Sequence, residues 1–95
     1  MTNHWLDIQN SDVVMIIGAN PAEQHPAAFM WVFKAMEKGA KLIVVDPRIG
    51  RTAAKADKYV AIRSGTDIAF IGAVINYVLE NELYHKEYLV NYTNT

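Results

Sequence analysis

The sequence contains no cysteine among its 95 residues. This chain therefore forms no disulfide, offers no thiolate nucleophile and supplies no thiolate ligand to an iron–sulfur cluster or a zinc ion. An excess of one charge is also missing, because nine basic and ten acidic residues leave a net charge of −1. Nucleic-acid-binding proteins usually carry a basic excess, so the composition argues against a nucleic acid as partner.

Long hydrophobic runs are absent as well. The longest uncharged stretch, residues 68–79, has twelve residues, whereas a membrane-spanning helix needs about 20. The first residues lack the basic start and the apolar run of a signal peptide. With 52% hydrophobic residues, the chain is typical of a globular domain with a modest core. We expect residues 1–95 to form a single domain that does not insert into a membrane.

Strand and helix patterns alternate along the chain. Residues 12–18 and 41–47 are nearly continuous runs of aliphatic residues, and a weaker run covers residues 58–63. Runs without polar alternation are typical of parallel strands covered by helices. The predicted helices cover residues 26–38, 52–56, 67–82 and 86–92. Gly39 is placed to end the first helix and Thr66 to cap the longest one, whose broad apolar face we expect to be buried.

This alternation predicts an α/β fold, a Rossmann-like, three-layer αβα half-sheet of about three parallel strands with flanking helices. In an open parallel sheet, ligands bind beyond the carboxyl ends of the strands. Residues 18–25, 46–48 and 63–67 follow the three strands, and all are rich in Gly, Asn, Asp and Arg. The sequence therefore predicts a ligand site at these loops.

Each loop also has a purely structural interpretation. The loop from Gly18 lacks the G-x-G-x-x-G pattern, so it either holds a phosphate on helix N–H groups or is only a strand-to-helix turn. Asp46 either accepts ribose hydroxyls or closes an Asp-Pro turn. Asp67 either accepts N–H donors from a guanine edge or is a first-turn helix residue.

The basic residues after the second strand divide in the same way. Lys55 and Lys58 are expected on a solvated face, whereas Arg48 and Arg63 follow strand ends and are candidates to contact a ligand. Constellations that carry chemistry are missing, because the three histidines are scattered and no serine has an evident base partner. We predict neither catalytic nor metal-ligating residues in this chain.

Several motifs stand in order along the sequence. They are Met1-Thr2-Asn3-His4-Trp5, Asp12 to Gly18, the G-x-N-x-x-E-x-H-P pattern of Gly18 to Pro26, Val45-Asp46-Pro47-Arg48, Ser64-Gly65-Thr66-Asp67 and Asn91-Tyr92-Thr93-Asn94. As a set they resemble the molybdopterin oxidoreductase family, and within it the large (alpha, catalytic) subunit of formate dehydrogenases that carry molybdenum or tungsten. The resemblance implies a Rossmann-like domain that binds one of two molybdopterin guanine dinucleotides around the metal.

The resemblance also implies which residues bind that cofactor. The first loop would contact the pyrophosphate and pterin side, Asp46 the guanosine ribose, and Asp67 the guanine edge. The full implied set is Gly18, Asn20, Glu23, Gln24, His25, Asp46, Arg48, Gly65, Thr66 and Asp67.

Members of this family are several times longer and carry a four-cysteine cluster domain, a cysteine or selenocysteine metal ligand and an active-site arginine, none of which this sequence contains. The resemblance therefore implies an internal fragment of a larger subunit. The parent would oxidise formate to carbon dioxide and pass electrons to iron–sulfur clusters, whereas the fragment alone would bind no cluster and be inactive.

The implied partners are the rest of the catalytic subunit and an iron–sulfur electron-transfer subunit, and exposed apolar surface would favour self-association of the fragment. The periplasm is implied as the location of the parent, with the cytoplasm as the alternative. Other interpretations are a stand-alone nucleotide-binding α/β module, a scaffold that only retains the fold, and the same segment of a nitrate-reductase-type relative.

Overall fold

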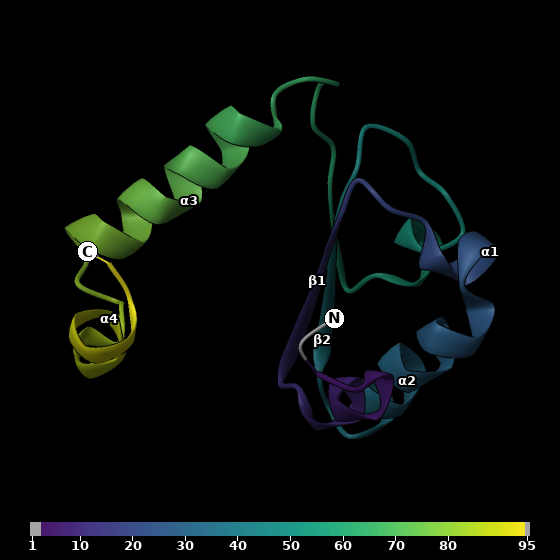
Figure 1. Cartoon of the computed structure of the whole chain (residues 1–95). Helices are drawn as coiled ribbons and strands as arrows, with labels where there is room; N and C mark the ends of the chain where they lie inside the picture. Colours follow the sequence, from purple (N-terminus) through teal and green to yellow (C-terminus); the bar gives the residue numbers. More distant parts are fainter. Residues whose placement is uncertain (1–2, 95) are drawn as a thin grey trace. The chain divides into compact units, whose positions relative to one another are not determined.

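The computed structural model describes residues 3–94, and the chain divides into two compact units, Met1–Arg63 and Ser64–Thr95. Met1 and Thr2, which contribute to the family resemblance, lie outside the described residues. The elements are η1 (Trp5–Asn10), β1 (Val13–Ile17), α1 (Pro21–Gln24), α2 (Pro26–Glu37), β2 (Lys41–Val45), η2 (Ala53–Lys55), β3 (Lys58–Val60), α3 (Asp67–Glu80) and α4 (Lys86–Tyr92) (Figure 1). The prediction of a single domain over residues 1–95 stays a prediction.

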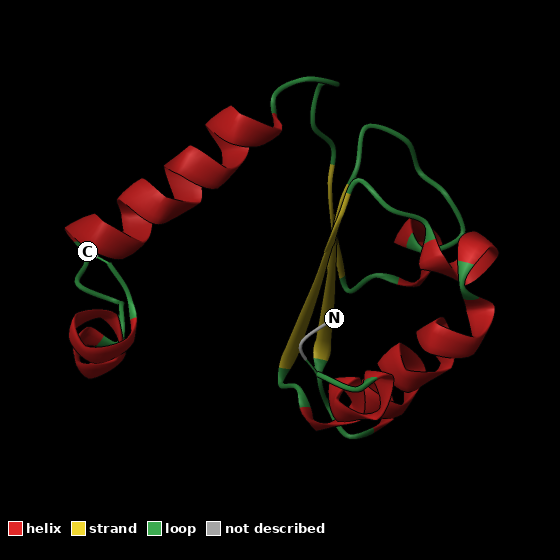
Figure 2. Cartoon of the chain, in the orientation of Figure 1, coloured by secondary structure: helices red, strands yellow, loops and turns green. Residues whose placement is uncertain are grey.

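The first unit is built on a three-stranded parallel sheet in the order β1-β2-β3 (Figure 2). Val13 pairs with Lys41 and Ile17 with Val45, so β1 and β2 begin and end side by side. The shorter β3 starts opposite Ile43. The predicted α/β class and three parallel strands are confirmed, and all three carboxyl ends lie at one edge of the sheet.

A small apolar core lies between the sheet and α2. Phe29 and Val32 of α2 pack with Leu42 and Val44 of β2, and Ala53 of η2 completes the buried cluster. Such burial is the main favourable contribution to folding and holds α2 against one face of the sheet. Helices on the other face, the third layer of the predicted fold, stay a prediction.

The end of α2 shows why the sequence stops the helix where it does. Gly39 has a φ of +101°, in the left-handed region that glycine adopts without strain. Its N–H donates to Met36 O at 2.9 Å, and the Ala40 N–H donates to Ala35 O at 3.0 Å. These two bonds form a Schellman cap and confirm the predicted role of Gly39.

Two short elements of the first unit were not expected from the sequence. The 3-10 helix η1 is capped by His4, whose Nδ1 accepts a hydrogen bond from the Leu6 N–H at 3.2 Å. One turn of helix, α1, precedes α2. Neither element is long enough to show an amphipathic period, and for this reason periodicity did not reveal them.

The second unit contains α3 and α4, and here one expectation is wrong. Thr66 is the N-cap of α3 as predicted, but its side chain makes no capping hydrogen bond. No residue of α3 is buried, and Ile68 is 88% exposed, whereas we expected a broad buried face. Two helices alone offer too little apolar surface to cover that stripe. In the described part of the chain, no helix is long and apolar enough to cross a membrane.

The side chain of Asp57, the residue before β3, binds the amino end of β2. Its Oδ2 accepts a hydrogen bond from the Leu42 N–H at 2.8 Å, and its Oδ1 lies 3.5 Å from the Lys41 Nζ. The bond from Leu42 lowers the pKa of Asp57, partial burial opposes this, and the Lys41 charge lowers it further. The carboxylate thus extends the pairing of β2 and β3 beyond their backbone ladder.

This contact predicts a specific loss of stability in acid. Because the pKa of Asp57 is lower in the folded chain than in the unfolded chain, the carboxylate stabilises the fold above its unfolded pKa of about 3.9, and this contribution is lost as the pH falls through the lowered value. Asp57→Asn keeps an acceptor oxygen but does not titrate. Urea unfolding at a series of pH values should show that the free energy of unfolding falls more steeply below about pH 4 for the wild type than for Asp57→Asn. Parallel profiles would contradict this role.

Candidate ligand site at the carboxyl edge of the sheet

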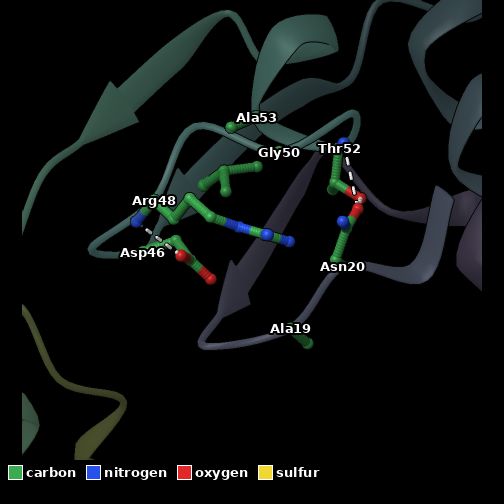
Figure 3. Close-up of a pocket in the computed structure, with 8 residues that line it drawn as sticks. Ala19, Asn20, Asp46, Arg48, Gly50, Thr52 and Ala53 are labelled. Carbon is green, nitrogen blue, oxygen red and sulfur yellow. Dashed lines mark hydrogen bonds between the residues drawn. The ribbon is translucent and has the colours of Figure 1, made fainter. Parts of the chain in front are cut away.

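The loops that follow β1 and β2 meet at the carboxyl edge of the sheet. Gly18 has a φ of +61° and turns the chain away from β1, while its N–H still donates to Val45 O at 2.9 Å. The parallel pairing therefore places Gly18 beside the start of the Asp46 loop. Between these loops lies a pocket lined by Ala19, Asn20, Val44, Asp46, Arg48, Gly50, Thr52 and Ala53 (Figure 3).

Asp46 is held from three sides. Its N–H donates to Val60 O at 3.2 Å, its carbonyl oxygen accepts from the Tyr59 hydroxyl at 2.7 Å, and its Oδ1 accepts from the Arg48 N–H at 2.8 Å. The last bond closes an Asx turn, as the structural interpretation of Asp46 predicted. It uses one carboxylate oxygen. Among the described residues, none donates a hydrogen bond to the other oxygen, Oδ2, which is available to a ligand.

Arg48 brings a positive charge to the same place. Figure 3 shows its side chain extending from the Asp46 side of the pocket towards Asn20. The remaining cavity is about 20 Å³, which is room for about one water molecule. A larger ligand would therefore lie along the outer rim of the two loops or displace the guanidinium.

A set of hydrogen bonds in the wall of this pocket, here called the clasp, joins the two loops. Asn20 Oδ1 accepts from the Thr52 hydroxyl at 2.7 Å and from the Thr52 N–H at 3.3 Å. The Thr52 Oγ1 in turn accepts from the Ala22 N–H at 3.0 Å. Thr52 is 1% exposed. Sequence reasoning treated Thr52 only as the start of a short helix; its one signal was a polar residue leading into the apolar pair Ala53-Ala54.

The structure separates the residues that the resemblance implied. Asn20, Asp46 and Arg48 line the pocket, with Gly18 next to it. Glu23 lies further out, where its Oε1 is 3.8 Å from the Arg51 Nε, an exposed pair of little energetic weight.

The next two residues of the first loop, Gln24 and His25, lie elsewhere. They line an apolar groove with Trp5 and Trp31, between η1 and α2. The structure therefore does not bring them to the pocket at the carboxyl edge.

The third strand-end segment spans the division between the units: Arg63 ends the first unit, and Ser64 onward belongs to the second. Gly65 has a φ of +83°, and Asp67 is the first residue of α3, where a carboxylate is favourable to the helix dipole. Their roles towards a ligand stay predictions. Across residues 3–94, no group of three or more His, Asp or Glu side chains is placed to hold a metal ion.

Comparison with known proteins decides the family. A sequence profile described as molybdopterin oxidoreductase matches residues 1–94. The chain belongs to the molybdopterin oxidoreductase family. This is the family that the motifs from Gly18 and Asp46 implied.

The relatives include subunits named as formate dehydrogenases. The chain is 58% identical over 94 residues to formate dehydrogenase subunit alpha of Megalodesulfovibrio gigas, and 56% identical over 95 residues to the formate dehydrogenase-O major subunit of Escherichia coli. It is 50% identical over 94 residues to the formate dehydrogenase major subunit of Haemophilus influenzae. Each comparison covers 99% of this chain and 9% of the relative, so the chain spans about a tenth of the length of these relatives.

The clasp predicts how this segment responds to substitution at Thr52. Thr52→Val keeps the shape but leaves the Ala22 N–H without its buried acceptor, which should lower the free energy of unfolding by about 1–3 kcal/mol. Thr52→Ser keeps the hydroxyl and loses one methyl group, which costs about 0.8 kcal/mol. In urea unfolding, the free energy of unfolding should therefore be lower for Thr52→Val than for Thr52→Ser. The reverse order would show that the hydroxyl does not support the two loops.

Proposed function

We propose that the loops after β1 and β2 bind the nucleotide part of a molybdopterin guanine dinucleotide cofactor that carries molybdenum or tungsten. The observation that supports this most is the meeting of Asp46 and Arg48 with the loop from Gly18 at the carboxyl edge of the sheet. In open parallel sheets this edge is where nucleotides bind. Family membership supports a pterin cofactor, and the guanine dinucleotide form is our further proposal.

The donor and acceptor set suits such a ligand. Asp46 Oδ2 accepts hydrogen bonds, which is what ribose hydroxyls need, while its Oδ1 is already bonded to the Arg48 N–H. The Arg48 guanidinium offers several N–H donors and a positive charge to a pyrophosphate. Because the cavity between the loops holds only about one water, we place the dinucleotide along the rim, where backbone groups from Gly18 onward are close.

At the level of the whole subunit, we propose that the chain is a cofactor-binding segment of a formate dehydrogenase, an oxidoreductase that converts formate to carbon dioxide. The names of its relatives support this assignment. The bound metal would supply the two-electron redox chemistry. The residues of this chain would bind and orient the nucleotide, so we expect the isolated chain not to oxidise formate.

The partners proposed for the segment follow from the same assignment. The rest of the catalytic subunit would complete the cofactor site, and an iron–sulfur subunit would receive the electrons. Exposed apolar side chains of β1, such as Val13 and Met15, would favour self-association of the isolated chain.

Nucleotide titration tests the site directly. We expect isothermal titration calorimetry of the full 95-residue chain to show heat of binding with millimolar GDP. Asp46→Asn should weaken GDP and ADP binding to the same extent, by about tenfold, because both share the ribose. Asp7→Asn, an exposed acid on η1 at the amino end of β1, is the matched control and should leave the affinity unchanged. No heat with the wild type, or equal losses in both variants, would contradict the proposal.

Asp67 calls for a separate test, because its proposed contact is to the base. Asp67→Asn should weaken GDP binding by about tenfold and leave ADP binding unchanged, since adenine lacks the N–H donors that a carboxylate would accept from guanine. A loss for neither nucleotide would leave Asp67 with its structural role at the start of α3.

A further inference from the structure

The clasp in the wall of the pocket joins parts of the chain that are far apart in sequence. Asn20 lies in the loop after β1, and Thr52 follows the loop after β2, 32 residues later. The Thr52 hydroxyl is both donor and acceptor in this clasp, to Asn20 Oδ1 at 2.7 Å and from the Ala22 N–H at 3.0 Å. One buried side chain therefore fixes both the turn after β1 and the first turn of α1.

The clasp also fixes the orientation of the Asn20 amide. The Thr52 N–H and O–H are both directed at Asn20, so the atom facing them must be the carbonyl oxygen. The amide nitrogen then faces Gly50, where an added Cβ would lie 2.8 Å from Nδ2. Gly50 therefore leaves room for the amide nitrogen, while Thr52 donates to the amide oxygen.

This arrangement changes what Asn20 is expected to do. Its Oδ1 already accepts two hydrogen bonds from Thr52, which uses the two lone pairs of an amide oxygen. That oxygen has no remaining capacity for a ligand. Asn20 is thus held as part of the wall of the pocket.

We infer that Thr52 is the positioning residue of the nucleotide site, because it locks Asn20 and thereby sets the loop from Gly18 against Asp46 and Arg48. This inference rests on the proposed function. A loop that is ordered before binding does not have to be ordered by the ligand, so preorganisation raises affinity without a direct contact. Thr52 itself is buried, so we expect it to act through Asn20 and not by direct contact with the nucleotide.

Substitutions at Thr52 separate positioning from stability. In calorimetric titrations of the full chain with GDP, Thr52→Val should weaken binding by about tenfold, and Thr52→Ser, which keeps the hydroxyl, should stay within about threefold of the wild type. Val32→Ala is the matched control, because it removes volume from the core between α2 and the sheet and Val32 makes none of the hydrogen bonds of the clasp. It lowers stability and should leave the GDP affinity unchanged. Circular dichroism at the titration temperature verifies that each variant is folded.

Gly50→Ala reaches the same clasp from the other side and is the second variant should Thr52→Val fail to fold. Its methyl group would displace the Asn20 amide while leaving the Thr52 hydroxyl in place. We expect a loss of GDP affinity of about tenfold here as well.

The outcomes distinguish the positioning role of Thr52 from the proposed nucleotide binding on which it rests. Wild-type affinity in Thr52→Val or in Gly50→Ala would overturn the positioning role and leave the proposed function standing. A loss in Val32→Ala equal to that in Thr52→Val would assign the effect to stability and also overturn the role. If the wild type itself binds no GDP, the proposed function fails, and the positioning role fails with it.

Discussion

Five residues of β1 pair in parallel register with five of β2, and this pairing decides which loops become neighbours. Because the strands run the same way and end together, Gly18 emerges beside Val45, and the polar residues that follow each strand meet at one edge. An antiparallel pairing of the same two segments would send Gly18 and Asp46 to opposite ends. The site therefore depends first on strand direction, which the connection through α2 imposes, and only then on its own side chains.

The polar network at this edge both holds the loop after β2 in place and leaves an acceptor for the proposed ligand. Asp46 closes an Asx turn with one carboxylate oxygen and presents the other, while Tyr59 and Val60 hold its backbone from β3. A buried hydrogen-bonded group that fixes a neighbouring one is a common way to keep a binding geometry without ligand. In this sense the structural and functional interpretations of Asp46 do not compete.

Much of this could be predicted from sequence, for identifiable reasons. Aliphatic runs bounded by Gly18 and by Asp46-Pro47 are local signals, so the strands, their parallel order and the strand-end loops followed from them. Gly39 ended α2 as expected because its role depends on the chain within four residues of it. The Asn20–Thr52 clasp could not be foreseen, because it joins residues 32 apart and either side chain alone fits an ordinary turn. The exposure of α3 could not be foreseen either. Periodicity tells which side chains share a face of a helix, but it does not tell whether another element covers that face.

Amide chemical shifts of the ¹⁵N-labelled chain during a GDP titration test the central claim most directly. The account predicts that the largest changes fall on Gly18, Ala19 and Arg48, at the carboxyl edge of β1 and β2. Changes centred instead on the groove of Trp5, His25 and Trp31, or no changes at millimolar GDP, would contradict it.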